Sequence, residues 1–153
     1  MSYDVPSDLI EIAKSFEGFH RVTQYTPEIL ASPYVCPAGY WTIGYGHLCA
    51  LDHEAITLSE GERYLEDDLR SSVRDSVRLC PILLLEPPRR LVAIADFTFN
   101  LGPGRLKNST LRRRVNEGDW EGARQEIQRW IWGGGKKLPG LIKRRAVEAE
   151  LLA

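Results

Sequence analysis

Several features that would place a chain in a special class are missing from this sequence of 153 residues. No run of about 18 apolar residues occurs, so we expect no transmembrane helix. The N-terminal stretch "MSYDVPSDLIEIAKSF" contains acidic residues and has no basic segment ahead of an apolar block. We therefore expect no signal peptide and synthesis in the cytoplasm. The three cysteines, Cys36, Cys49 and Cys80, form no CxxC pair, which argues against a metal centre, and their odd number leaves at least one thiol free.

What is present fits one globular domain. No internal repeat or low-complexity tract occurs, and 43% hydrophobic with 27% charged residues is typical of soluble globular proteins. The net charge is −1, but residues 1–88 hold 6 Lys and Arg against 14 Asp and Glu, whereas residues 89–153 hold 14 against 7. The basic half suits an anionic partner such as nucleic acid, a membrane or cell wall, or it is a solvated surface neutralised by the acidic half. No helix-turn-helix or similar motif supports binding to nucleic acid.

Apolar spacing predicts helices over most of the chain. The first is expected to begin at an N-cap, Ser7, and to end near Glu17, because a glycine follows. A long helix is expected from Ser59, where Glu62 would complete a capping box, to Leu79.

The second half of the chain predicts further helices. Residues 88–101 are apolar almost all round, which is typical of a buried central helix, and Gly102-Pro103-Gly104 is expected to end it. Shorter helices are expected after two N-caps, Ser109 and Asp119, the second with Trp120 and Trp130 on its core face. "GGGKKLPG" is predicted as a loop, and Pro139 as the start of the last helix.

The remaining segments predict a small β element. Residues 18–33 contain two prolines and no sustained periodicity, so a loop is expected, with room for one helical turn. Residues 34–50 alternate Trp41, Ile43 and Tyr45 with smaller residues and contain three glycines, which predicts a β-hairpin or ribbon. The fold class expected is therefore α+β.

Several blocks of residues resemble one known family. "FEG" followed by "YVCPAGYWTIGYGHL" is similar to the signature of the phage endolysins and lysozymes of glycoside hydrolase family 24. "FTFNLGPGRLKNSTLRRRVNEGDW" and "RWIWGGGKKLPGLIKRR" resemble later family blocks, in the family's order, so that the resemblance spans nearly the whole chain. It implies a lysozyme-like fold, mostly helical, with one small β lobe at about 34–52 beside an active-site cleft and a helical lobe at about 59–153. A single domain, 1–153, is expected.

The resemblance also implies a function. The family hydrolyses the β-1,4 bond between N-acetylmuramic acid and N-acetylglucosamine in peptidoglycan, without cofactor or metal. We expect a monomeric endolysin that acts during host lysis, inserts into no membrane and reaches the wall after a holin-type protein opens the membrane. Two alternatives stay open: a peptidoglycan-binding module without catalysis, and a lytic transglycosylase on the same fold.

Three residues match the catalytic positions of the family. Glu17 matches the general acid, Cys36 the position that holds Asp or, in one branch, Cys, and Thr42 the threonine that helps to hold the attacking water. Glycoside cleavage needs a proton donor and, across the sugar, a second group that activates water or stabilises the transition state. The hydroxyl of Thr42 can both donate to and accept from that water. By itself, a glutamate at a helix end is most often an ordinary surface residue.

Two features depart from the family pattern. A thiol stands where a carboxylate is common. Three roles are open for Cys36: it positions the water, acts as a thiolate or contributes little to catalysis. We favour the first, positioning of the water. Eighteen residues, Gly18 to Val35, separate Glu17 from Cys36, a longer connection than the family usually has. The extra stretch is expected near the cleft mouth and contains Glu28, which is either a substitute carboxylate or a solvated loop residue.

Leu48, Phe99 and Ser109 match positions that line the saccharide groove. Their alternatives are core packing for Leu48 and Phe99 and helix capping for Ser109. His47 is expected to be structural and, by the resemblance, to pair with Asp68, a contact that would raise the pKa of the histidine. A disulfide between Cys36 and Cys49 is conceivable across a hairpin but would consume the thiol assigned to the site.

Overall fold

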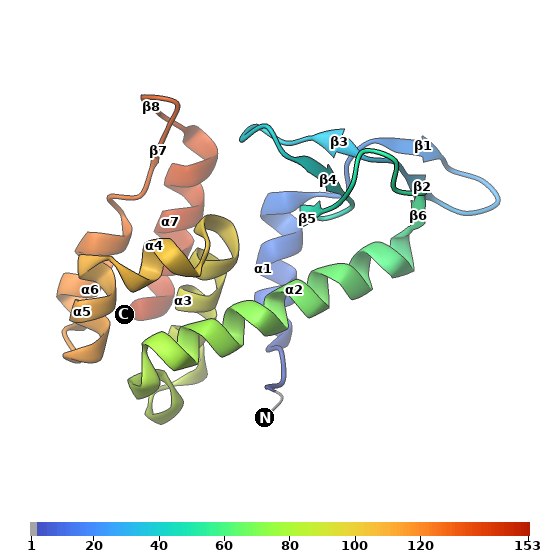
Figure 1. The fold of residues 1–153 in the computed structure, drawn as a ribbon. Coiled ribbons are helices and arrows are strands. Elements are labelled where there is room, and N and C mark those ends of the chain that lie inside the picture. Colours follow the sequence, from blue (N-terminus) through green and yellow to red (C-terminus); the bar gives the residue numbers. More distant parts are fainter. Residues whose placement is uncertain (1–2) are drawn as a thin grey trace. The chain divides into compact units, whose positions relative to one another are not determined.

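The computed structural model describes residues 3–153 and shows helices joined to short antiparallel strands (Figure 1). The chain forms two compact units. One consists of Ile10–Asp68, and the other of Leu69–Ala153 together with the N-terminal stretch up to Leu9. Among the described residues, no helix is both long and apolar enough to cross a membrane.

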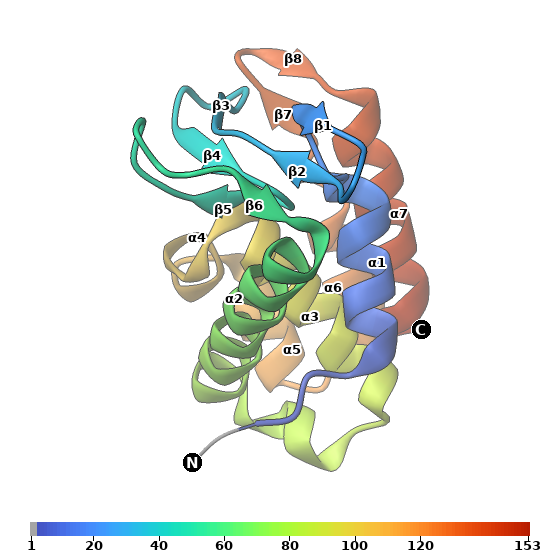
Figure 2. The same cartoon turned by 90° about the vertical axis from the view of Figure 1, so that its right-hand side faces the viewer.

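The unit Leu69–Ala153 is helical. It contains the C-terminal part of α2 (Leu58–Leu79), the 3-10 helix η1 (Pro81–Leu85), α3 (Pro88–Leu101), α4 (Pro103–Lys107), α5 (Thr110–Asn116), α6 (Trp120–Ile127), β7 (Trp132–Gly133), β8 (Lys136–Lys137) and α7 (Pro139–Leu152). Helix α3 packs along α7, and α6 contacts both α5 and α7. Both cartoon views place the β7–β8 hairpin at the N-terminal end of α7 (Figure 2).

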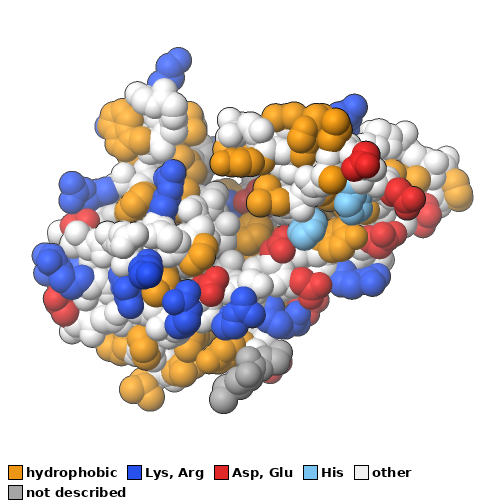
Figure 3. Space-filling view, in the orientation of Figure 1, with side chains coloured by type: hydrophobic (Ala, Val, Ile, Leu, Met, Phe, Trp, Pro, Cys, Tyr) orange, Lys and Arg blue, Asp and Glu red, His pale blue; other side chains and the backbone are white. Residues whose placement is uncertain are grey.

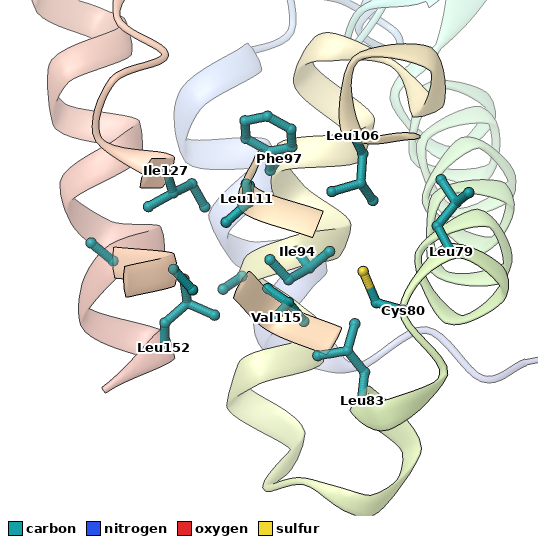
Figure 4. Packing of buried hydrophobic residues seen from close by; sticks show 13 residues of the cluster. Leu79, Cys80, Leu83, Ile94, Phe97, Leu106, Leu111, Val115, Ile127 and Leu152 are labelled. Carbon is teal, nitrogen blue, oxygen red and sulfur yellow. The ribbon is translucent and has the colours of Figure 1, made fainter. Parts of the chain in front are cut away.

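Side chains from most of these helices meet in one hydrophobic core. Phe97 and Ile94 of α3 are fully buried there, among residues of η1, α4, α5, α6 and α7 (Figure 4). Trp120 and Trp130 pack against this core, as predicted. Because α3 contributes buried residues on several faces, the prediction of a central helix at 88–101 is confirmed.

Charged groups inside this unit are paired. The guanidinium of Arg144 donates to both carboxylate oxygens of Asp96 at 2.8 Å, and both side chains are almost fully buried. Arg145 donates to Asn100 and to Glu148, each at 2.8 Å. The side chain of Asn100 thus accepts from a buried arginine.

The unit Ile10–Asp68 holds two small antiparallel sheets. Strands β1 (Val22–Gln24), β2 (Leu30–Ala31) and β6 (Ile56–Thr57) form one sheet in this order, and β3 (Tyr34–Val35), β4 (Trp41–Ile43) and β5 (His47–Leu48) form the other. The expected hairpin at 34–50 is confirmed and gains a third strand. The expected loop at 18–33 is wrong, because its backbone pairs in β1 and β2, with Val22 opposite Ala31.

Helix α1 (Ser7–Glu17) has the predicted bounds, whereas α2 begins earlier than predicted. The hydroxyl of Thr57 accepts from the backbone N–H of Glu60 at 3.1 Å and donates to the Glu60 carboxylate at 3.2 Å. The cap is therefore Thr57 with Glu60, and the predicted pair Ser59 and Glu62 is wrong. Thr57 ends strand β6, which gives it the extended backbone that an N-cap needs.

In the second half, the side chains of Ser109 and Asp119 cap α5 and α6, and Pro139 begins α7, all as predicted. The predicted loop at "GGGKKLPG" is partly wrong, because β7 and β8 form a hairpin with Gly134-Gly135 as its turn. Gly102-Pro103-Gly104 ends α3 and also begins α4, since proline suits the first turn of a helix.

Candidate active site

Glu17 is the last residue of α1, and its carboxyl group lies against the glycine-rich turn between β4 and β5. A Cβ atom added to Gly46 would lie 3.0 Å from Oε2 of Glu17. The φ angle of Gly46 is 81°, a value that L side chains rarely adopt. Gly46 is therefore glycine for two reasons, the backbone conformation and the closeness of the Glu17 carboxyl group.

The sheet β3–β4–β5 places Thr42 at its centre. Its register sets Tyr34 opposite Thr42, and Thr42 opposite Leu48, so these three side chains share one face. Thr42 is 2% exposed, and its hydroxyl donates to the carbonyl of Tyr40 at 2.9 Å. The hydroxyl oxygen keeps lone pairs for another donor.

Cys36 begins the tight turn that joins β3 to β4. The N–H of Gly39 donates to the carbonyl of Cys36 at 2.8 Å, and the N–H of Cys36 donates to the carbonyl of Tyr40 at 2.9 Å. Burial would raise the pKa of the Cys36 thiol, but interactions with the backbone of Tyr40, the hydroxyl of Thr42 and the backbone of Ala38 and Gly39 lower it below its ordinary value. The half-buried sulfur is thus in contact with Thr42 and in a favourable place for negative charge.

The other two thiols behave in the opposite way. Burial raises the pKa of Cys49, and burial raises the pKa of Cys80 to about 11 despite the nearby Arg112. All three cysteines are free thiols in the structure.

Tyr34 connects these groups and was missed by the sequence analysis. Burial, followed by the charges of Glu17, Cys36 and Cys49, raises its pKa to about 12, although a hydrogen bond with the backbone of Gly46 opposes the shift. The phenol is therefore neutral at physiological pH and lies within electrostatic reach of both Glu17 and Cys36. Its place two residues before Cys36, a spacing that in extended chain puts two side chains on one side, is a signal that could have identified it.

His20 was also missed. Its ring lies edge-on to the ring of Tyr34 at 5.3 Å between centroids, and its Nε2 contacts the carbonyl oxygen of Glu17. No pattern in the sequence pointed to His20, because the segment that follows Glu17 was predicted as a loop.

The predicted pair of His47 and Asp68 is confirmed. Nδ1 of His47 lies 2.8 Å from Oδ2 of Asp68, and the imidazole stacks on the ring of Tyr64 at 4.5 Å. The hydrogen bond with Asp68 raises the pKa of His47, burial lowers it less, and the charges of Asp68 and Asp67 add to the rise.

The three residues matched to the saccharide groove lie in different settings. Leu48 is 64% exposed, so the core-packing alternative is wrong for this residue. Phe99 is half-buried, with the guanidinium carbon of Arg144 5.8 Å from its ring centroid. Ser109 caps α5 by accepting from the N–H of Arg112 at 3.0 Å, so the capping expected of it is confirmed. Leu48 belongs to the unit Ile10–Asp68, as do Glu17, Cys36 and Thr42, whereas Phe99 and Ser109 belong to the helical unit.

Glu28 lies exposed in the connection between β1 and β2. Nothing in its surroundings ties it to Cys36: its carbonyl accepts from the side chain of Gln24 at 3.2 Å. Within residues 3–153, no three His, Cys, Asp or Glu side chains gather as metal ligands would.

Comparisons with known proteins agree with this architecture. Over residues 14–148 the chain matches the phage lysozyme family. It is 35% identical to an endolysin of Bacillus phage B103, over 93% of this chain and 51% of that protein, so it spans about half of that relative's length. It is also 34% identical to a SAR-endolysin of Escherichia phage Mu, over 86% of this chain and 78% of that protein.

Solved structures show the same fold. The muramidase domain of SpmX from Asticaccaulis excentricus has a TM-score of 0.78 and 29% identity, covering 98% of this chain and 97% of that one. An endolysin from Escherichia coli O157:H7 phage FAHEc1 has a TM-score of 0.73 and 25% identity, with coverages of 98% and 93%. The lysozyme-like α+β class is thereby confirmed, with several short sheets in place of one hairpin. The chain belongs to the phage lysozyme family, whose endolysins hydrolyse peptidoglycan.

Proposed function

We propose that this chain is a muramidase that hydrolyses the β-1,4 bond between N-acetylmuramic acid and N-acetylglucosamine, with Glu17 as the general acid. One observation carries the proposal: the Glu17 carboxyl group lies against Gly46, in the turn between the strand of Thr42 and the strand of Leu48. The neutral Tyr34, within electrostatic reach of both Glu17 and Cys36, supports it. A proton donor and a water-holding pair in one small unit are the two elements that glycoside hydrolysis requires.

The chemistry follows from these groups. The protonated carboxyl group of Glu17 gives its proton to the glycosidic oxygen as the bond to the anomeric carbon breaks. Water adds to the anomeric carbon and loses a proton to a basic group or to solvent. The Thr42 hydroxyl, which donates its hydrogen to the carbonyl of Tyr40 and can accept from the water, and the neighbouring Cys36 sulfur hold that water. Leu48, Phe99 and Ser109 contact the saccharide.

We assign Cys36 to the branch of the family that has cysteine at the second catalytic position. The lowered pKa of its thiol and its contact with the Thr42 hydroxyl support a role in positioning water. A thiolate fraction at neutral pH would make the sulfur a better acceptor for that water.

Replacement of Glu17 by Gln tests the assignment. The amide keeps the size of the side chain but cannot donate a proton to the leaving oxygen, so clearing of permeabilised cells should fall by about 10²- to 10⁴-fold. Glu28→Gln is the matched control and should keep full activity, since Glu28 is exposed in the β1–β2 connection. Circular dichroism checks that both variants are folded.

Other results would change the conclusion. Full activity of Glu17→Gln would remove the general acid from the proposal. A wild-type protein that binds cell wall without clearing it would be a binding module. Released fragments with 1,6-anhydro ends, detected by mass spectrometry, would identify a lytic transglycosylase.

Replacing Cys36 by Ser, Ala and Asp separates the roles of the sulfur. If Cys36 positions water, the Ser and Asp variants should keep most activity and the Ala variant should lose about tenfold, the usual cost of one hydrogen bond to a charged group. Equal activity of the Ala variant and wild type would show that Cys36 is dispensable, with Cys49→Ala as the control for loss of a thiol.

We further propose that the protein acts as a monomer on the cell wall after a holin-type protein has opened the membrane. The support is the family itself, in which several relatives are named endolysins. Expression alone should leave cells intact, and co-expression of a holin should lyse them. Lysis without a holin would favour an independent export route, a possibility of interest because other relatives are named SAR-endolysins.

A further inference from the structure

The β7–β8 hairpin combines an exposed tryptophan with lysines. Trp132 is 57% exposed, and its cross-strand partner Lys137 places Nζ 5.4 Å from the centroid of the indole ring. Lys136, next to the turn, is exposed as well. Figure 3 shows basic and hydrophobic side chains together at this hairpin, at the upper left. Trp132 is not among the side chains that pack against the hydrophobic core, so most of its ring is available to a ligand.

The charge around the hairpin is of one sign. Residues 127–147 contain no Asp or Glu but six Lys and Arg. Two of the six, Arg144 and Arg145, are buried and paired with Asp96 and Glu148, so the four exposed ones set the surface charge: Arg129, Lys136, Lys137 and Lys143. Of these four, Arg129 has an acidic partner in the structure, Glu126 at 3.3 Å.

The hairpin has a backbone that holds this surface in a defined shape. Gly134 and Gly135 have φ angles of 57° and 78°, as both central residues of a two-residue type I′ turn require. A Cβ on Gly133 would lie 2.5 Å from Cδ1 of Leu138, so the Leu138 side chain lies directly over that glycine. The N–H of Leu138 also donates to the carbonyl of Ile131 at 3.0 Å. Trp132 is thus presented by an ordered turn.

We infer that the β7–β8 hairpin is a second binding surface for peptidoglycan, separate from the residues assigned to cleavage; this rests on the proposed function. An indole face suits the apolar C–H face of a β-linked aminosugar. The lysines suit the free carboxylates of the peptide stems that the glycan carries. An anionic membrane would also attract lysines, but its binding grows with buried apolar area, and the exposed large apolar side chains at and beside the hairpin are few: Trp132, Leu138 and Ile142.

Binding to purified sacculi at low temperature tests the inference, in a Glu17→Gln background so that cleavage does not interfere. Trp132→Ala and the double variant Lys136→Ala/Lys137→Ala should each weaken binding by about tenfold, as loss of a central aromatic or charged contact commonly does. The matched control is Arg74→Ala/Arg78→Ala, which removes two exposed positive charges from α2 and should bind like its parent. Thermal unfolding checks that every variant is folded.

Three results would overturn the inference. Unchanged binding of both hairpin variants would show that the surface is not used. If the α2 control weakens binding to sacculi as much as the hairpin variants do, the effect comes from the loss of positive charge in general and not from the hairpin. If the hairpin variants lose the parent's binding to vesicles of phosphatidylethanolamine and phosphatidylglycerol but still bind sacculi, the hairpin is a membrane-binding surface instead. None of these results would contradict the proposed cleavage activity. That activity is tested independently, by comparing the clearing activities of wild type and Glu17→Gln.

Discussion

The helical unit Leu69–Ala153 and the unit Ile10–Asp68 fix their side chains by different means. In the first, α3 and α7 have 14 residues each and enclose, with their neighbours, a core of 13 buried residues. In the second, no strand exceeds three residues, and turns at Gly18, Gly39, Gly44 and Gly46 have positive φ angles. The first unit is therefore ordered by one large core, whereas the second combines a smaller set of buried residues, such as Ile43, Ile56 and Leu65, with turns of special backbone conformation. Glu17, Cys36 and Thr42 all lie in the second.

The largest expected effect tests the helical side of this comparison. Phe97 is fully buried at the centre of the core, so Phe97→Ala should lower the free energy of unfolding by about 3–5 kcal/mol. Leu84→Ala is the control, because Leu84 is 58% exposed and its truncation should change stability by less than about 0.5 kcal/mol. Urea unfolding measures both, and similar losses would contradict the central place of Phe97.

An intermediate effect tests the other unit. Gly46→Ala and Gly39→Ala both place a side chain at positive φ, and each should cost about 1–2 kcal/mol of stability. Only the first meets Glu17, since a Cβ on Gly39 has no neighbour within 4 Å. Gly46→Ala should therefore also lose clearing activity, and Gly39→Ala should keep most of it. Equal activities would show that closeness to Gly46 does not position Glu17.

The smallest expected effect is a pH dependence within the same unit. The pKa of His47 is raised in the folded state, so its pairing with Asp68 stabilises fully below the ordinary histidine pKa of about 6.5 and is lost as pH rises through the folded value. For a partly exposed pair the effect should be below about 1 kcal/mol. Urea unfolding of wild type and Asp68→Asn at several pH values measures it. A difference between the two that stays constant from pH 5 to 8 would contradict this account; that interval brackets the titration of an ordinary histidine at about 6.5.

The same contrast explains which parts of the fold could be predicted. Caps and breakers such as Ser109, Asp119 and Pro139 act within one turn of helix, so the sequence located α5, α6 and α7. Strands β1 and β2 depend on pairing across the chain, including β6 twenty-five residues beyond β2, and their own residues show no alternation. The start of α2 was misplaced because two overlapping capping signatures were present and only the end of β6 decides between them.

The residues of the site also fall into those that the sequence identified and those that only the structure revealed. Glu17, Cys36 and Thr42 were identified through motif residues, and their catalytic roles stay predictions. Tyr34 and the contact between Glu17 and Gly46 depend on distances through space, which spacing along the chain does not reveal. His47 with Asp68 was predicted only through the family resemblance.

The pKa values of the three thiols set the chemical reactivity of the protein. Alkylating and oxidising reagents attack thiolates, and at neutral pH the thiolate population is concentrated on Cys36, since the pKa values of Cys49 and Cys80 are raised. A reagent used at low excess should therefore label Cys36 first, which peptide mapping would locate. An electrophile attached to a short saccharide would act where the substrate is proposed to bind. This one sulfur therefore offers a route to covalent inhibitors that would not react with a protein lacking a cysteine at this position.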